Sequence, residues 1–194
     1  MLFRSLEVRD LWPDLPVLFG ALRNPFTIGL AKWLEKIAYA HATHVVALSP
    51  GIQRAVVSRG VSLKTSTVIP NSCDIDLFKA TSGDSLLLPQ QISERDFIVL
   101  YPGTIGIANG LSYIVKLAAE TLKINPSIKF IVVGEGKEKN QTIELARNLK
   151  VLDVNLFFLN AISKKEIPLY YKRANLIINT LVNQRPLWNS SPNK

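Results

Sequence analysis

Two glycine-containing segments hold the residues whose types and spacing could do chemistry. These residues are Gly103, Thr104, Ile105, Gly106 and Asn109 in the first segment, and Gly134, Glu135 and Gly136 in the second. Each segment follows an apolar run typical of a buried parallel strand and precedes a helical pattern. Glycine lets backbone N–H groups approach an anionic ligand, and a helix N-terminus adds a partial positive charge. The pattern predicts a nucleotide-binding edge, while tight strand-to-helix turns remain the alternative.

The periodicity around these segments predicts alternating strands and helices. The expected strands are 3–8, 44–48, 65–69, 96–101, 128–133, 154–159 and 175–180, and the expected helices are 25–40, 50–59, 109–124, 137–149 and 163–173. This alternation indicates right-handed β-α-β units with parallel strands. We therefore predict an α/β protein with two Rossmann-like parallel-sheet domains, 1–73 and 96–194, joined by a linker over 74–95. Both domains have fewer strands than a doubly wound sheet usually has, so we expect both to be incomplete.

Composition narrows the class of protein and its partners. Apolar residues make up 47% of the 194-residue chain and charged residues 20%, which is typical of a globular protein. The only cysteine, Cys73, favours a reducing compartment, and we expect a cytoplasmic protein. The net charge of +8 predicts an acidic partner. Because the basic residues are spread out and not interleaved with aromatic ones, we do not expect nucleic acid to be that partner.

A series of motifs along the chain resembles bacterial family-four glycosyltransferases. The motifs are Glu7–Asp14, Val45–Gly51, Val68–Phe78, Tyr101–Gly106, Val132–Gly136 and Ser191–Lys194. They occur in the family's order and span nearly the whole chain. The subgroup that they resemble most is the L-fucosamine transferases of surface-polysaccharide assembly.

The resemblance implies a GT-B fold, with an acceptor-side domain before a nucleotide-sugar donor domain. It implies a retaining transfer, without cofactor or metal, from a UDP-sugar such as an N-acetylated deoxyhexose to a lipid-linked glycan. It also implies peripheral contact with the inner face of the plasma membrane. A non-catalytic remnant that only binds a nucleotide-sugar is the alternative.

The resemblance assigns roles to individual residues. Gly103–Gly106 and Asn109 would lie against the donor diphosphate, and Gly134–Gly136 against the base or ribose. The other donor residues would be Asn193 and Lys194, with Asn71 facing the cleft between the domains. Asp10 would act as the base or charge stabiliser at the acceptor hydroxyl, because a carboxylate can fill either role. Arg9 would bind an acceptor phosphate, since it stays protonated.

Four positions depart from the family's usual residues. Many members have a His-Asp pair where this chain has Arg9-Asp10, and basic residues at the positions of Thr104 and Asn109. The first acid of the family's Glu-x(7)-Glu motif would fall near Asn189. These departures are the reason why the non-catalytic alternative stays open.

Two further patterns have both a functional and a structural interpretation. His41 and His44 have a spacing found in metal sites, but no third ligand is nearby, and we predict no metal. The helix expected at 25–40 has an apolar stripe of Phe26, Leu30, Trp33, Leu34, Ile37 and Ala38. We expect this stripe to pack on its own sheet, and contact with a membrane surface is the alternative.

Overall fold

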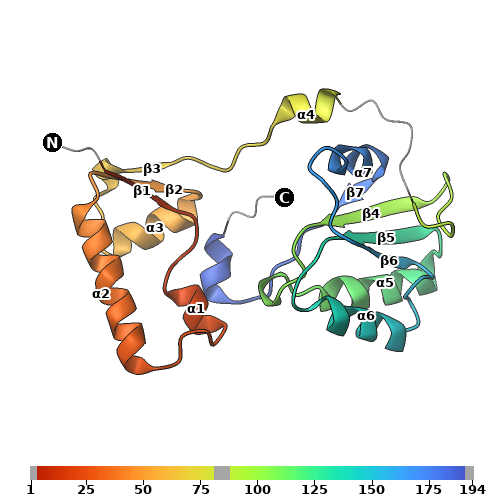
Figure 1. Cartoon of the computed structure of the whole chain (residues 1–194), viewed down its shortest axis with the longest axis horizontal. Coiled ribbons are helices and arrows are strands. Elements are labelled where there is room, and N and C mark those ends of the chain that lie inside the picture. The colour runs from red at the N-terminus through yellow and green to blue at the C-terminus, as the bar shows by residue number, and fades with distance from the viewer. Residues whose placement is uncertain (1–3, 81–87, 191–194) are drawn as a thin grey trace. The chain divides into compact units, whose positions relative to one another are not determined.

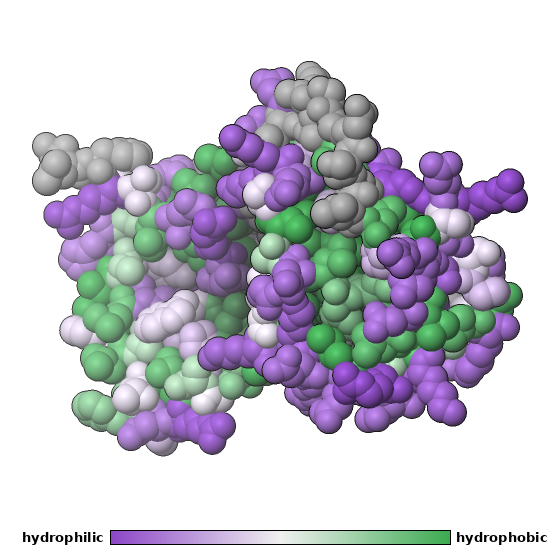
Figure 2. Space-filling model, turned by 45° about the vertical axis from the view of Figure 1, so that its right-hand side comes forward, coloured by the Kyte–Doolittle hydropathy of each residue, from purple (hydrophilic) through white to green (hydrophobic). Residues whose placement is uncertain are grey.

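In the computed structural model, the described residues 4–80 and 88–190 form two compact units (Figure 1). Unit 1 holds the described residues of 1–73 and of 183–193, and unit 2 holds those of 74–182. Apolar side chains fill the core of each unit and also reach the surface of both (Figure 2). The chain is therefore an α/β protein with two parallel sheets, as the sequence predicts.

Unit 1 is a three-stranded parallel sheet in the order β1-β2-β3. Its elements are β1 (Ser5–Val8), α1 (Asp14–Leu18), α2 (Pro25–His41), β2 (His44–Ala47), α3 (Pro50–Ser58), the 3₁₀ turn η1 (Leu63–Thr65), β3 (Ser66–Val68) and the 3₁₀ helix η3 (Arg185–Asn189). Helices α2 and α3 cover one face of the sheet, where Val8, Val45 and Ala47 meet Ile52 and Val56.

Local sequence signals fix where the helices of unit 1 begin. Asn24 accepts a hydrogen bond from the Phe26 amide at 2.9 Å, and Pro25 starts α2. The Ser49 hydroxyl accepts a hydrogen bond from the Ile52 amide at 3.1 Å, and Pro50 starts α3. Both starts combine a side-chain N-cap with proline at the first helical position, where its missing N–H is harmless.

Unit 2 is a four-stranded parallel sheet in the order β6-β5-β4-β7. Its elements are α4 (Ile75–Ala80), β4 (Phe97–Pro102), the 3₁₀ turn η2 (Ile107–Asn109), α5 (Ser112–Ile124), β5 (Ile128–Val133), α6 (Lys139–Asn148), β6 (Leu156–Leu159), α7 (Ile167–Arg173) and β7 (Leu176–Ile177). Strands β5 and β6 are added in turn on one side of β4, and β7 then pairs with β4 on its other side. The topology reverses between β4 and β7, and ligands of open α/β sheets bind outside the carboxyl ends of strands at such a point.

Side chains of β4 and β5 enter two apolar layers. Val99, Tyr101 and Val132 face α5 and α6, whereas Leu100 and Ile131 face α7. Burial on both faces explains why these strands read as continuous apolar runs.

Some element boundaries differ from the sequence prediction. The helix expected from Asn109 begins at Ser112, because Gly110 adopts a left-handed conformation (φ 57°) and separates it from η2. The strand expected at 175–180 is limited to Leu176–Ile177. Helix α4 lies inside the segment predicted to be a linker.

Candidate functional site

The loops after β4 and β5 are held together by backbone hydrogen bonds at the carboxyl edge of the unit 2 sheet. The Gly103 amide donates to the Val133 carbonyl and the Ile105 amide to the Glu135 carbonyl, both at 2.9 Å. The Ile105 carbonyl in turn accepts from the Glu138 amide at 3.1 Å. The amides of Gly103 and Ile105 are therefore used within the protein. The contact of this loop with a diphosphate stays a prediction.

Gly134 and Gly136 are needed for the close approach of these two loops. A Cβ at Gly134 would lie 2.9 Å from the Gly103 carbonyl carbon, and one at Gly136 would lie 2.8 Å from the Ile105 nitrogen. Real Cβ contacts below 3.0 Å are essentially never seen. Gly134 also has φ 156°, which favours glycine. Packing accounts for both glycines, and their predicted contact with a base or ribose stays a prediction.

The segment after β7 completes the loop cluster on the other side of β4. Thr180 donates its hydroxyl to the Asn109 carbonyl at 2.6 Å, and the Val182 amide donates to the Ala108 carbonyl at 2.9 Å. Asn109 thus lies at the point where the strand order reverses. Sequence analysis missed Thr180 and Val182, because nothing in the sequence shows that β7 returns beside β4.

The Tyr101 side chain, on β4, holds the loop after β4 by a hydrogen bond. Its ring is fully buried, and its hydroxyl donates to the Thr104 carbonyl at 2.8 Å. Burial raises the pKa of the Tyr101 hydroxyl far above its ordinary value, so it stays protonated and remains a donor. Tyr101 thereby fixes the position of Thr104.

A charged cluster joins the loops after β5 and β6. The Lys139 ammonium donates to the Glu135 carboxylate at 2.6 Å and to the Asn160 side-chain oxygen at 2.9 Å. The Lys139 side chain is only 13% exposed, so its charge is largely held between these two partners. Glu135 lies in the loop before α6 and Lys139 is the first residue of α6, so the pair closes the turn between β5 and α6.

In unit 1, Arg9 and Asp10 directly follow β1 and are exposed. The Arg9 guanidinium lies 3.7 Å from the Glu7 carboxylate. Both predicted residues line a pocket of about 200 Å³ that also includes Trp12 and Tyr39. The structure brings Arg9 and Asp10 together at a strand end, as the prediction requires, but leaves the catalytic role of Asp10 untested.

Asn71 lies in a different pocket of unit 1, with a volume of about 510 Å³. Glu7 and Ser72 line the same pocket. Glu7 therefore borders this pocket and the one lined by Arg9 and Asp10, and it is a polar candidate that the sequence analysis missed. Its alternation with Val8 along β1 placed it on the face opposite the core.

The loop carrying Arg9 and Asp10 is followed by an ion cluster centred on Arg59. Arg59 pairs with Asp14 at 2.5 Å and with Glu35, and it donates to the Trp12 carbonyl at 3.3 Å. These contacts join α1, α2 and the end of α3. Arg59 thus supports the segment that begins at the candidate catalytic residues.

Three remaining predictions concern the histidines and the chain end. His41 contacts the Ile37 carbonyl and His44 contacts the Thr67 hydroxyl, so the two do not form a common site. Among residues 4–80 and 88–190, no group of three or more potential ligands could hold a metal ion. Asn193 and Lys194 lie outside the described residues. Asn189 belongs to unit 1, where its carbonyl accepts a hydrogen bond from the Ser49 hydroxyl at 2.5 Å.

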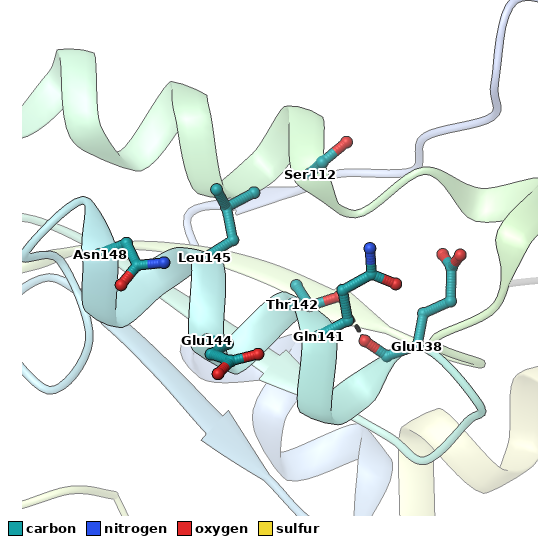
Figure 3. Close-up of a pocket in the computed structure, with 7 residues that line it drawn as sticks. All are labelled: Ser112, Glu138, Gln141, Thr142, Glu144, Leu145 and Asn148. Atoms are coloured by element: carbon teal, nitrogen blue, oxygen red, sulfur yellow. Dashed lines mark hydrogen bonds between the residues drawn. The ribbon is translucent and has the colours of Figure 1, made fainter.

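A further pocket of unit 2, with a volume of about 320 Å³, lies between the start of α5 and one face of α6 (Figure 3). Its polar lining includes Ser112, Glu138 and Glu144, and the Thr142 hydroxyl donates to the Glu138 carbonyl at 2.7 Å. None of the predicted donor residues lines it. It borders the loop cluster at Glu138, whose amide donates to the Ile105 carbonyl.

Comparison with known proteins shows which family a segment of unit 2 resembles. Residues 88–181, from before β4 to just after β7, match the family described as "Glycosyl transferases group 1". The matched segment contains both glycine loops and Thr180 at the carboxyl edge of the unit 2 sheet. Residues 88–181 are therefore similar to the group 1 glycosyltransferase family.

Individual relatives agree with this class. The chain is 25% identical over 135 residues to WcaI of Escherichia coli (strain K12), which is named as a colanic acid biosynthesis glycosyl transferase. The match covers 68% of this chain and 33% of WcaI. The structure resembles Anabaena HepE, solved with UDP and glucose, with a TM-score of 0.66 and 17% identity over 91% of this chain. It also resembles WaaG, a glycosyltransferase of lipopolysaccharide biosynthesis, with a TM-score of 0.62 and 16% identity over 94% of this chain.

The chain spans 33% of the length of WcaI, 46% of HepE and 53% of WaaG. At these low identities the solved structures show the fold alone. The fold is that of GT-B glycosyltransferases, which confirms the predicted fold class. Within the described part of the chain, none of the helices has the length and apolar character needed to cross a bilayer.

Proposed function

We propose that this chain is part of a retaining glycosyltransferase that moves a sugar from a nucleotide-diphosphate donor to a lipid-linked glycan. The observation that carries the proposal is the match of residues 88–181 to group 1 glycosyltransferases, because that segment contains the glycine loops at the switch point of the sheet. A UDP-sugar is the proposed donor, and HepE, with its bound UDP and glucose, supports this choice. A surface polysaccharide is the proposed product, supported by the names of WcaI and WaaG.

In the proposed mechanism, unit 2 binds the donor and unit 1 supplies the acceptor-side groups. The loop after β4 lies against the diphosphate, where backbone donors stabilise the charge that develops on the leaving phosphate. Asp10 orients or deprotonates the acceptor hydroxyl. An N-acetylated deoxyhexose as the sugar, as in the L-fucosamine transferases, is the narrower form of the proposal.

A thermal-shift titration with UDP, UDP-GlcNAc, GDP and NAD tests donor binding by the chain itself. We expect UDP compounds alone to raise the melting temperature, because a ligand that binds only the folded state stabilises it. Tyr101→Phe should weaken the response, since it removes the support of Thr104, whereas Lys116→Ala on the exposed side of α5 should not. An equal response to all nucleotides, or none, would contradict the proposed donor.

Turnover separates an enzyme from the non-catalytic alternative. The assay is sugar release and transfer from UDP-GlcNAc in a full-length relative that retains the equivalent of Asp10. Asp10→Ala should abolish transfer while leaving the UDP-induced shift unchanged, because unit 2 binds the donor. Wild-type transfer rates in this variant would refute the role of Asp10, and binding without any turnover in the unmodified protein would favour the non-catalytic alternative.

A further inference from the structure

The pocket beside Arg9 and Asp10 combines apolar and aromatic surface with a few charged side chains. Its volume is about 200 Å³, and it is lined by residues of β1, the loop after β1 and one part of α2. Trp12, Ala38 and Tyr39 supply apolar surface, whereas Arg9 and Asp10 come from the end of the strand. Sites for small molecules typically have this composition, in which the polar groups fix the orientation of the ligand. We call it the Trp12 pocket.

Trp12 is an exposed residue between two buried ones. It is 46% exposed, whereas Leu11 and Pro13 are buried. The Trp12 carbonyl accepts a hydrogen bond from the Arg59 guanidinium at 3.3 Å, and Arg59 also pairs with Asp14 at 2.5 Å. The backbone that carries the indole is therefore fixed on both sides. A group held in place in this way loses little conformational freedom when a ligand binds to it.

Tyr39 offers ring surface to the pocket rather than a charge. The Glu35 carboxylate interacts with the Tyr39 hydroxyl and is also paired with Arg59. Burial raises the pKa of the Tyr39 hydroxyl far above its ordinary value, and the neighbouring Glu35 raises it further, so Tyr39 stays neutral. The polar groups on the α2 side of the pocket are thus engaged with one another.

The exposed charges of the pocket are two acids and one base. Glu7, Arg9 and Asp10 are all exposed, and the Arg9 guanidinium lies 3.7 Å from the Glu7 carboxylate. Two negative charges and one positive charge leave a local excess of −1, which opposes the binding of an anion. Hydroxyl groups suit this set better, because they can donate to the carboxylates and accept from the guanidinium.

From this arrangement we propose that the Trp12 pocket binds a neutral sugar ring of the acceptor, with Trp12 stacked against the ring. A sugar ring presents C–H groups on its faces and hydroxyls along its edge, so it matches both the aromatic surface and the charged side chains. The acceptor phosphate that the resemblance assigns to Arg9 fits these charges less well. Because Trp12 and Asp10 line the same pocket, a sugar held there has its hydroxyls available to Asp10.

This inference rests on the proposed function and adds to it a binding residue and a class of ligand. The two can still fail separately. The UDP-induced rise in melting temperature depends on unit 2, whereas sugar binding at Trp12 depends on unit 1. A response to UDP without a response to sugar would refute the Trp12 pocket alone, and the reverse result would refute the proposed donor alone.

Tryptophan emission measures sugar binding by the 194-residue chain without nucleotide or turnover. Trp33→Phe with Trp188→Phe leaves Trp12 as the only tryptophan of the chain. The methyl glycosides of glucose, N-acetylglucosamine and fucose should change its emission in a saturable way, because stacking changes the polarity around the indole. Sorbitol is the matched probe, since it has hydroxyls but no ring, and it should have no effect. The proposal is overturned if no glycoside gives a saturable change, or if sorbitol or inorganic phosphate gives an equal one.

The KM for the acceptor gives the second test, in a full-length relative that retains the equivalents of Trp12 and Asp10. Trp12→Leu should raise the acceptor KM about ten-fold, the size of effect expected from one aromatic contact, and leave the KM for the UDP-sugar unchanged. Trp12→Phe should retain most of the affinity, because a smaller ring can still stack. Trp33→Leu is the matched control, since Trp33 is 56% exposed and lies outside the pocket. An unchanged acceptor KM in Trp12→Leu, or an equal rise in Trp33→Leu, would overturn the role of Trp12.

Discussion

The close packing of the two glycine loops makes Gly136 a sensitive position. Gly136 has no positive φ, so alanine meets no conformational obstacle there and its effect is purely steric. The added Cβ would lie 2.8 Å from the Ile105 nitrogen and even closer to the Ile105 carbonyl. Both neighbours are backbone atoms, which cannot move aside as the end of a flexible side chain can.

The expected loss of stability follows from the separation of the two loops that the added Cβ would require. Separating the loops would strain or break two hydrogen bonds. In one, the Ile105 amide donates to the Glu135 carbonyl, and in the other, the Glu138 amide donates to the Ile105 carbonyl. Each such bond contributes about 1 kcal/mol net. Overpacking adds about 1–3 kcal/mol. We expect Gly136→Ala to lower the free energy of unfolding of unit 2 by about 3 kcal/mol.

Urea denaturation with two probes measures this effect. The three tryptophans, Trp12, Trp33 and Trp188, all lie in unit 1, so their emission reports on that unit, whereas far-UV circular dichroism reports on both. Gly136→Ala should shift the dichroism transition to lower urea. Gly106→Ala is the matched control, because its nearest atoms would be 3.7 Å away. The reasoning is refuted if Gly136→Ala is as stable as the unmodified chain, or if Gly106→Ala loses as much.

Three further substitutions test other parts of the structure. Gly29→Ala should stabilise unit 1 by about 0.5–1 kcal/mol, since a Cβ there meets nothing within 4 Å and glycine is unfavourable inside a helix; a tryptophan-detected urea midpoint that falls would contradict this. Arg59→Ala should destabilise unit 1 by about 2–3 kcal/mol because it leaves two carboxylates without their shared partner, and an unchanged midpoint would show that the cluster is too solvated to matter. Tyr101→Phe should lower the free energy of unfolding of unit 2 by about 1 kcal/mol, because it removes the hydrogen bond from the Tyr101 hydroxyl to the Thr104 carbonyl. The dichroism transition in urea measures this loss, and an unchanged transition would mean that water replaces the hydroxyl.

Strands buried on both faces could be predicted closely from the sequence. The run at 128–133 forms β5 over the predicted residues, and the run at 96–101 forms β4 one residue later. Their apolar continuity depends only on having core on both sides. Strand β7 could not be predicted as well, because its extent depends on pairing with β4 rather than on its own composition.

The glycine loops show a second limit of the sequence. Their glycines indicate that backbone comes close to something, but not what it comes close to. In the structure, Gly134 and Gly136 approach Gly103 and Ile105 of the neighbouring loop. The sequence therefore located the edge of the sheet where the candidate site lies. It could not show that amides of one loop donate to carbonyls of the other, because that depends on which strands are neighbours.

Helix α2 shows why periodicity predicts a face but not what covers it. The spacing of Phe26, Leu30 and Trp33 correctly indicates that they share one side. The helix has a second, less apolar side, and that side is fixed inward by the pairing of Glu35 with Arg59. A long-range ion pair of this kind leaves no periodic signal. With Glu35 paired inward and Ala31 buried on the same side of α2, the residues Phe26, Leu30, Trp33 and Leu34 are exposed, contrary to the expectation that they pack on the sheet.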